Sequence, residues 1–226
     1  SDVCSSDLPR TPATVLVNLP GAGQSGVVVT APEVALDSPE RRAAQLATAV
    51  LGGGYSTRLN AELRIRRGLT YGASAANELQ PSGGVMRAAA QTKHASAAEV
   101  AQVSRDEILR LGREAPAEAE LAARKAALVG GFGRSFDTTA GLAGVVLGQV
   151  ERGRPLAELA RTAPEIEAVT AEQVREHAAR HWTPESLRTV IVGDLAAGGD
   201  ALKALDPKAL RLQAAELDLE SPTLRR

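Results

Sequence analysis

The stretch LGGGYSTRLNAELRIRRGLTYGASA, residues 51–75, carries the chain from helix to sheet. Its glycines at 52–54 end a preceding apolar helix, because glycine takes the backbone conformations that helix ends require. A second helix follows from Ser56 to about Arg67 and stops at Gly68, a residue suited to the left-handed conformation that follows many helices. The segment LTYGASAAN after it has the character of a strand. The elements on either side of this stretch then determine the fold class.

Two β-rich runs, 15–19 and 27–31, come before this stretch and are separated by a Pro/Gly turn. The helix that ends at the glycines starts with Ser38 as N-cap and Pro39 at the first helical position. Beyond the stretch we expect a second strand, several helices and a buried strand in SLRTVIVGD. One of these helices is expected to end at the glycines 130–131. Two begin with the pattern of a capping box: Ser96 with Glu99, and Thr170 with Gln173.

The order is therefore two strands, two helices, two strands, several helices and one strand. Because strands and helices alternate in groups, a layered α+β domain fits better than a doubly wound parallel fold. We expect a mixed, largely antiparallel sheet with helices packed on one face. One domain would span residues 13–195, after a polar linker or truncated start at 1–12 and before a tail of helix or loop at 196–226.

Composition limits the classes of partner. The chain has 226 residues and a formal net charge of −1 at pH 7, and its single cysteine is Cys4. A nearly neutral chain gives no electrostatic case for nucleic acid or for an anionic membrane surface. One cysteine excludes a disulfide framework within this sequence and a Cys-based zinc ribbon. No apolar run approaches the roughly 18 to 20 residues that a membrane span needs, so we expect no nucleic acid partner and no membrane span.

The histidines are the first candidates for metal ligands. His177 and His181 lie four residues apart in EHAARH on an expected helix, so both imidazoles project from one face. The acidic residue next to them precedes the pair instead of lying between its members as in zincins, and Arg180 would repel a cation. His94 stands alone in a turn. We therefore expect no metal site in this chain, and a half-buried helix face near Trp182.

Neither glycine-rich turn has the pattern of a nucleotide site. GAGQSG, residues 21–26, follows a strand but runs into another strand, and LGGGYSTR, residues 51–58, lacks the P-loop lysine with its following Ser or Thr. No Gly-x-Ser-x-Gly elbow is present, and no histidine pairs recognisably with a serine and a carboxylate. The remaining candidates for chemistry are Arg64 and Tyr71.

Arg64 and Tyr71 lie seven residues apart, on either side of the Gly68 turn. Arg64 falls in the last turn of its helix, where a cation also interacts favourably with the helix dipole, so a purely structural role stays open. Tyr71 is expected three residues into the following strand, so that both side chains emerge near the same end of the sheet. A guanidinium fork and a phenol placed together suit the binding of peptide carbonyl oxygens, with the phenol donating to a forming oxyanion.

Several segments together resemble the C-terminal half of the insulinase (pitrilysin, M16) family of zinc peptidases, which includes the mitochondrial processing peptidases. The resemblance covers about residues 13–194. It implies an α+β half that faces a homologous half across a closed chamber, on the same chain or as a separate subunit. The segments that carry it are PGAGQSGVVVTAP, the stretch 51–75, ELAARKAALVGGF and VTAEQVREHAARHWTPESLRTVIVGD, in that order.

The family places its zinc in the other half, in an inverted motif His-x-x-Glu-His that is absent from this sequence. The resemblance therefore implies a half that has no metal or cofactor of its own and works with the zinc of its partner. In such halves the residues that match Arg64 and Tyr71 reach toward that zinc, bind the substrate backbone and support catalysis. A glycine-rich loop of processing peptidases that contacts precursor peptides matches Gly53 and Gly54, although here a short helix-to-helix turn is the alternative.

The reaction that the resemblance implies is hydrolysis of unfolded peptides by the assembled pair, with this chain inactive alone. Core subunits of respiratory complexes share the fold without proteolysis, so an inactive scaffold or binding subunit is the alternative. Retention of both Arg64 and Tyr71 favours the peptidase interpretation. Bacterial relatives occur in the periplasm and in the cytoplasm, and we expect the periplasm.

Overall fold

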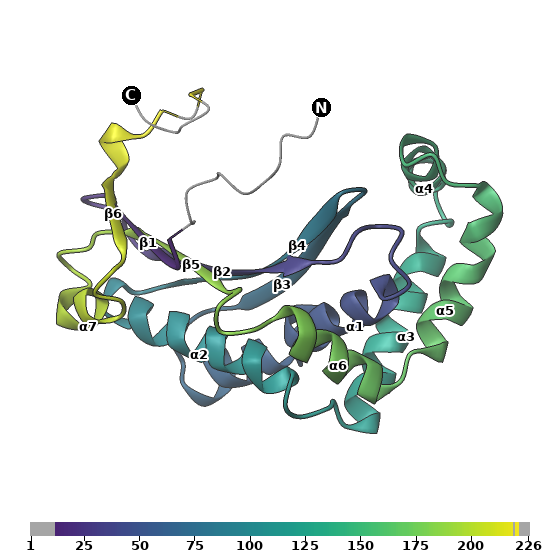
Figure 1. Cartoon of the computed structure of the whole chain (residues 1–226), viewed down its shortest axis with the longest axis horizontal. Coiled ribbons are helices and arrows are strands. Elements are labelled where there is room, and N and C mark those ends of the chain that lie inside the picture. Colours follow the sequence, from purple (N-terminus) through teal and green to yellow (C-terminus); the bar gives the residue numbers. More distant parts are fainter. Residues whose placement is uncertain (1–11, 219, 222–226) are drawn as a thin grey trace.

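A computed structural model describes residues 12–218 and 220–221, and its strands form one sheet (Figure 1). The strands are β1 (Thr14–Asn18), β2 (Ser25–Glu33), β3 (Ala73–Gln80), β4 (Gly83–Thr92), β5 (Arg188–Gly193) and β6 (Leu210–Gln213). Their order across the sheet is β3-β4-β2-β5-β1-β6. β2 pairs antiparallel with β4 and β5, β3 pairs antiparallel with β4, and β1 pairs parallel with β5 and β6. The sheet is thus mixed and largely antiparallel, which confirms the expected α+β class.

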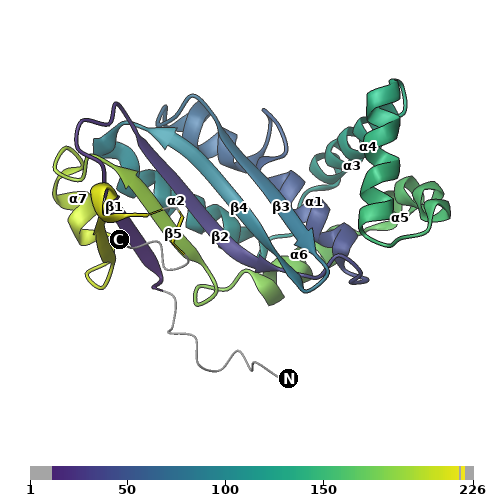
Figure 2. The same ribbon diagram turned by 90° about the horizontal axis from the view of Figure 1, so that it is seen from above.

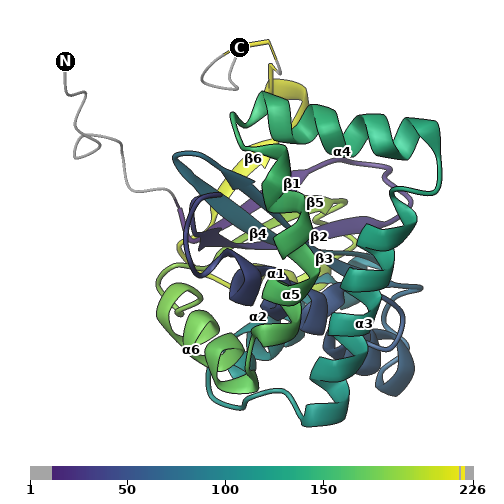
Figure 3. The same ribbon diagram turned by 90° about the vertical axis from the view of Figure 1, so that its right-hand side faces the viewer.

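The helices are α1 (Arg41–Gly52), α2 (Ala97–Leu111), α3 (Glu118–Arg134), α4 (Thr139–Glu151), α5 (Thr162–Ala168), α6 (Ala171–His181) and α7 (Gly199–Ala204). All of these helices but α7, which packs beside α2, form two groups. α1, α2 and α6 lie under one face of the sheet, and the described residues place no layer of helices over the other face (Figure 1, Figure 2). α3, α4 and α5, the helical arm, stand beyond one end of the sheet, with α4 rising on the uncovered side (Figure 3).

Four shorter helical segments complete the description: η2 (Asn60–Arg66), η3 (His94–Ser96), η4 (Leu156–Arg161) and η5 (Ala214–Glu216). η2 is a π-helix, and the other three are 3-10 helices. η2 and the loop after it connect α1 to β3, and therefore occupy the middle of the stretch 51–75.

The core lies between the sheet and the helices α1, α2 and α6. Successive residues of a strand point to opposite faces, so Val27, Val29 and Ala31 of β2 are buried against the helices while the residues between them are less buried. Leu46 of α1 and Val100 of α2 are fully buried on the other side of this layer. Burying a large aliphatic side chain contributes about 1.5–3 kcal/mol each. One face of the sheet is thus committed to the core, and the other remains accessible.

One of the two expected capping boxes is confirmed and the other is wrong. Thr170 has an extended backbone, and its hydroxyl accepts from the backbone N–H of Gln173 while the Gln173 side chain accepts from Thr170 N–H. Ser96 makes no side-chain cap, because η3 already gives it a helical backbone with φ −98° and ψ −3°. The expected start at Ser38 and Pro39 is also early. α1 begins at Arg41, and Ser38 instead accepts a turn hydrogen bond from Glu40 N–H at 3.1 Å.

Two further boundaries differ from expectation. α3 continues through the glycines 130–131 to Arg134, because a glycine costs only about 1 kcal/mol within a helix and α3 packs against α1 and α5. The tail contains the strand β6, with Leu210 opposite Val15, where we expected only helix or loop. The linker expected at 1–12 lies outside the described residues apart from Pro12. None of the helices described is long and apolar enough to cross a membrane.

Candidate functional site

Arg64 lies in the expected helix, which in the structure is the π-helix η2. π-helical turns are rare and occur frequently at functional sites. The guanidinium carbon of Arg64 lies 4.7 Å from the centre of the Tyr55 ring. This cation-π contact holds the plane of the guanidinium but leaves its N–H groups free to donate to a ligand.

Arg64 differs in this respect from the arginines around it. Arg58 makes two hydrogen bonds of 2.9 Å to the carboxylate of Glu120. Arg67 donates to Glu99 at 3.0 Å. Within residues 12–218 and 220–221, no hydrogen bond or ion pair engages the Arg64 guanidinium. A charged fork that this part of the chain leaves unpaired is available for a carbonyl or carboxylate of another molecule.

Tyr71 lies in the loop between η2 and β3, and not three residues into the strand as expected, because β3 begins only at Ala73. Gly68 takes φ +63° at the end of η2, which confirms its expected left-handed conformation. The side chain of Tyr71 is 89% exposed. Burial does not explain the presence of this large aromatic residue, so its hydroxyl and ring face are free for contact with another molecule.

Two threonines fix the loop that carries Tyr71. Thr70 Oγ1 donates to the backbone oxygen of Gln91 at 2.7 Å, and Thr92 Oγ1 donates to that of Leu69 at 2.6 Å. These side-chain bonds tie the loop to the end of β4 in place of a strand ladder, which is why β3 starts later than the sequence suggests. The loop therefore presents a free phenol from a fixed backbone.

Asn60 is the residue of this segment that sequence reasoning missed. Its buried amide accepts from Ala73 N–H at 2.9 Å and donates to Ala73 O at 2.9 Å and to Gly54 O at 3.0 Å. One side chain thereby joins the glycine turn, η2 and the start of β3. Asparagine is a poor helix former, which is the only signal that the sequence offers, and that signal names no partner.

Tyr71 borders a hollow of about 410 Å³ on the uncovered face of the sheet. The residues at the bottom of the hollow have mostly small side chains, which allow the backbone of another molecule to approach the sheet closely. Arg64 does not line the hollow, and among the residues that the structure describes no hydrogen bond joins it to Tyr71. The structure thus places both residues on one short segment but not in contact. The floor is formed by β2, β3 and β4, with Gly26, Val28, Ser74 and Ala89 among its residues.

The two candidate glycines form the turn between α1 and η2. Gly53 is the C-cap of α1, and Gly54 O accepts from the side chain of Asn60. Gly52, just before them, has a separate packing role, because a Cβ there would lie 2.1 Å from the backbone nitrogen of Ala75. Glycine at 52 lets the end of α1 approach β3 closely. The geometry fits the short-turn interpretation of this segment.

A second polar group lies on the helix-covered side of the sheet. His177 is 1% exposed and meets the Trp182 ring edge to face at 5.7 Å. Glu40 Oε2 lies 3.4 Å from His177 Nδ1 and 3.2 Å from His181 Nε2. Arg180, which we expected to repel a cation from the histidine pair, instead contacts the other carboxylate oxygen of Glu40. Sequence reasoning missed Glu40, because it is far from α6 along the chain.

The surroundings of Glu40 act on its pKa in opposite directions. Burial by itself raises the pKa of Glu40, but hydrogen bonds with His181 and His177 and the charge of Arg180 outweigh it, so the pKa is lowered. On the far side of the ring, His177 Nε2 lies 2.9 Å from Glu33 Oε1. We name Glu33, Glu40, His177 and His181 the histidine cluster.

The third histidine, His94, is hydrogen-bonded through both ring nitrogens. The Nε2–H of His94 donates to Ala22 O at 2.7 Å, and its Nδ1 accepts from the hydroxyl of Ser25 at 2.8 Å. These bonds fix the loop before β2 against the end of β4.

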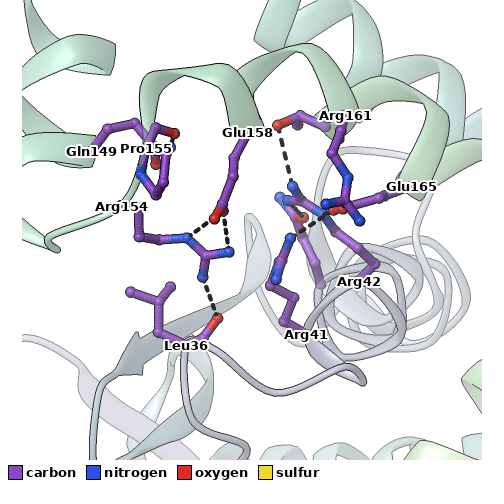
Figure 4. A network of polar contacts seen from close by, with 11 residues as sticks. Leu36, Arg41, Arg42, Gln149, Arg154, Pro155, Glu158, Arg161 and Glu165 are labelled. Atoms are coloured by element: carbon purple, nitrogen blue, oxygen red, sulfur yellow. Dashed lines mark hydrogen bonds and ion pairs between the residues drawn. The ribbon is translucent and has the colours of Figure 1, made fainter.

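Ion pairs join the helical arm to the sheet layer (Figure 4). Glu165 of α5 lies 2.7 Å from Arg41 Nη2 and 3.1 Å from Arg42 Nε, at the start of α1. Arg154, in the connection after α4, donates to Leu36 O at 3.2 Å. These contacts hold the arm beside α1 without any apolar residue of α4 being buried.

Known proteins share this architecture. A peptidase M16 inactive domain from Pseudomonas fluorescens is similar over 80% of this chain, with 24% identity and a TM-score of 0.72. A protease from Helicobacter pylori is similar over 79%, with 18% identity and a TM-score of 0.72. This chain covers 43% of each of those two chains. A chain of complex III from Candida albicans with bound Inz-5 is similar over 88% of this chain, with 15% identity and a TM-score of 0.73, and this chain covers 50% of it.

Sequence identities this low show only a shared fold, whereas a match to a family shows that the chain belongs to it. No curated protein matches the chain in sequence. Residues 4–128, more than half of the chain, match the family described as peptidase M16 inactive domain. The stretch 51–75 and the strands β1 to β4 lie within that match. The chain therefore belongs to the M16 peptidase family, as an inactive domain of that family.

Proposed function

We propose that this chain is the half of a chambered zinc peptidase that binds peptide substrate beside the zinc site of a homologous partner half. One observation carries the proposal: Arg64 and Tyr71 present an unpaired guanidinium and an 89% exposed phenol from a segment that Asn60 fixes. Buried polar side chains normally find partners in their own chain, whereas these two are exposed. These two polar groups are instead held ready for a ligand outside it.

The chemistry assigned to each residue follows from its donors. Arg64 binds carbonyl oxygens of the peptide through its planar N–H groups. The hydroxyl of Tyr71 donates to the oxygen of the scissile carbonyl as negative charge develops on it, and a donor that is already in place costs no reorganisation at that moment. The zinc of the partner half supplies the activated water. This chain alone is then inactive.

The substrate in this proposal is an unfolded peptide. An extended chain fits the hollow beside Tyr71, where Gly26 and Ala89 let its backbone approach the sheet. Gly53 and Gly54 are exposed beside η2, and we include them as peptide contacts of lesser weight than Arg64. The periplasm is proposed as the compartment on the resemblance alone.

The test combines the full chain with a zinc-bearing half from the same genome and follows cleavage of a quenched peptide. Arg64→Ala and Tyr71→Phe should each lower turnover by about 10- to 1000-fold, the range expected for losing one oxyanion donor. The matched control is Arg66→Ala on the same helical segment, because Arg66 is already paired with Glu62. Its turnover should stay at the wild-type level. Full activity in both Arg64→Ala and Tyr71→Phe would contradict the proposal.

An inactive scaffold or binding subunit is the second candidate function. The likeness to a chain of complex III, with a TM-score of 0.73, favours it. In that case the chain would form a tight complex with its partner, no peptide would be cleaved, and Arg64→Ala and Tyr71→Phe would leave assembly unchanged. Size-exclusion chromatography of the mixture, run beside the cleavage assay, separates the two functions.

A further inference from the structure

We propose that Glu40, His177 and His181 form a binding site for a divalent transition-metal ion such as Zn²⁺ on this chain itself. The site lies on the helix-covered side of the sheet, whereas the hollow beside Tyr71 lies on the uncovered side. It does not depend on the proposed peptidase function, because all its ligands come from the described residues of one chain.

The ligand atoms already have nearly the spacing that a tetrahedral ion requires. One ligand atom from each of Glu40, His177 and His181 lies within 4.8 Å of the other two. Glu40 Oε2 is 3.4 Å from His177 Nδ1 and 3.2 Å from His181 Nε2. Zinc bonds of about 2.0–2.1 Å place neighbouring tetrahedral ligands about 3.3–3.4 Å apart. Only the separation of the two nitrogens has to close, and water can complete the coordination.

The histidine pair has the geometry of a helical metal site. His177 and His181 lie four residues apart on α6, and their ring centres are 4.7 Å apart with the planes tilted by 37°. Helical residues at this spacing project from one face, as two histidines do in helical zinc motifs. Glu40 reaches the pair from the N-cap position of α1, so the third ligand comes from a different element.

Glu33 supplies the outer contact that metal-binding histidines usually have. A ligating histidine commonly donates its other ring N–H to a carboxylate, which fixes the tautomer and the ring orientation. His177 Nε2 lies 2.9 Å from Glu33 Oε1, and the two side chains are 1% and 0% exposed. Their present alignment falls short of a hydrogen bond.

His177 Nδ1 and Glu40 Oε2 lie 3.4 Å apart and form a hydrogen bond when the ring carries its proton on Nδ1. When the proton is on Nε2, the lone pair of Nδ1 faces the carboxylate oxygen, and a cation between these two acceptors makes the contact favourable. Arg180 binds Oε1 of Glu40 and leaves Oε2 available for an ion. The same cavity is, however, also lined by three further arginines, Arg41, Arg42 and Arg161. Glu33 Oε1 accepts from the backbone N–H of Val34 at 2.9 Å, while Glu33 Oε2 is buried without a hydrogen-bond partner in the described part of the chain.

An ion can reach this site from solvent. Glu40, His177 and Arg180 line a cavity of about 530 Å³ between α1, α5 and α6. His181 is 26% exposed, so the open side of the site also admits water. A bound ion would join β2, α1 and α6 through Glu33, Glu40 and the two histidines. The expected consequence is a structural one, since an ion that binds only the folded chain raises its stability.

The test uses the full untagged chain, stripped of metal, and titrates it with Co²⁺ and then with Zn²⁺. We expect one ion per chain, the visible absorption of tetrahedral Co²⁺, its displacement by Zn²⁺, and a higher unfolding midpoint with Zn²⁺. Glu40→Gln and His181→Gln should each weaken binding by at least about tenfold, and Glu33→Gln by about 10- to 100-fold, as for an outer contact. Glu176→Gln, an exposed carboxylate on the same helix, is the control and should bind as the wild type does.

Two results would overturn the proposal. The first is the absence of Co²⁺ absorption and of any Zn²⁺-dependent rise in the unfolding midpoint, which would leave the cluster as a protonated histidine between two carboxylates. The second is metal binding that Glu40→Gln and His181→Gln leave unchanged, which would place the ion elsewhere. Circular dichroism of each variant shows whether it folds. Both His181 and Glu40 are partly exposed, so these substitutions do not open the core.

Discussion

The two polar groups on opposite sides of the sheet differ in whether residues of this chain alone complete them. On the uncovered side, Arg64 and Tyr71 are exposed and keep donors that no described residue uses. On the helix-covered side, His177 is buried between Glu33 and Glu40, and every ring nitrogen faces a carboxylate of the same chain. The first group needs another molecule to complete it, whereas the second needs at most an ion. Stability measurements should therefore respond to the two groups differently.

The largest effect on stability is expected at Asn60, which fixes the exposed group without being part of it. Asn60→Ala removes the amide that satisfies both the N–H and the C=O of buried Ala73. Leaving such groups unpaired costs about 1–3 kcal/mol, and the loop of Tyr71 should lose its fixed position. Urea unfolding of the variant should show a lower free energy of unfolding by about 2–3 kcal/mol.

Asn77→Ala is the matched control for Asn60→Ala. Asn77 is also an asparagine of this segment of the sheet, but its side-chain nitrogen has no hydrogen-bond partner among the residues described. Removing it should change the free energy of unfolding by much less. Equal losses in Asn60→Ala and Asn77→Ala would mean that the hydrogen bonds of Asn60 do not hold the segment, and the comparison of the two groups would then fail on its exposed side.

Asn60 and Thr170 also show which features the sequence could reveal. Thr170 and Gln173 cap α6 through bonds between residues three apart, so the local pattern was sufficient. The same holds for Gly68, whose left-handed conformation follows from its place after a helix. The partners of Asn60, at Gly54 and Ala73, depend instead on how η2 packs beside β3. No local pattern specifies such packing.

For the same reason, the sequence could predict only the two histidines of the histidine cluster. The spacing of His177 and His181 identified a shared helix face, and the structure confirms it. Glu40 joins that face from a position 137 residues from His177, and only the packing of α1 on α6 brings them together. Strand β6 was missed because four residues give too short a pattern, and its pairing with β1 is again a long-range contact.

A smaller effect is expected at the cap of α6, the helix that carries the histidine cluster. Thr170→Ala removes the hydroxyl that accepts from Gln173 N–H, and losing such a cap costs about 1 kcal/mol. Ser96→Ala, at the corresponding position of α2, is the control, because Ser96 makes no side-chain cap. Chemical denaturation should separate the two variants by about that amount. If the two lost equal stability, the capping box would not explain the position of α6.

The smallest effect is expected at Glu165, which lies beside the same end of α1 as Glu40 and pairs with Arg41 and Arg42. Burial raises the pKa of Glu165, but the hydrogen bond from Arg42 and the charge of Arg41 outweigh it, so the pKa is lowered. A carboxyl with a lowered pKa stabilises the fold above its unfolded pKa of about 4.3, and this contribution is lost as the pH falls through the folded pKa. Near neutral pH, Glu165→Gln should therefore cost about 0.5–1 kcal/mol, the upper range for partly exposed pairs.

The pH dependence of this cost tests whether the two arginines, rather than an ion, account for the contribution of Glu165. Below the folded pKa of Glu165, the wild type and Glu165→Gln should have the same free energy of unfolding, and added Zn²⁺ should change neither the difference nor its pH range. Glu167→Gln, an exposed position on the same helix, should match the wild type throughout. A cost for Glu165→Gln that persists in acid, or that Zn²⁺ removes, would show that Glu165 acts through something other than Arg41 and Arg42. The contrast with Glu40, whose Oε2 faces two histidines, would then fail.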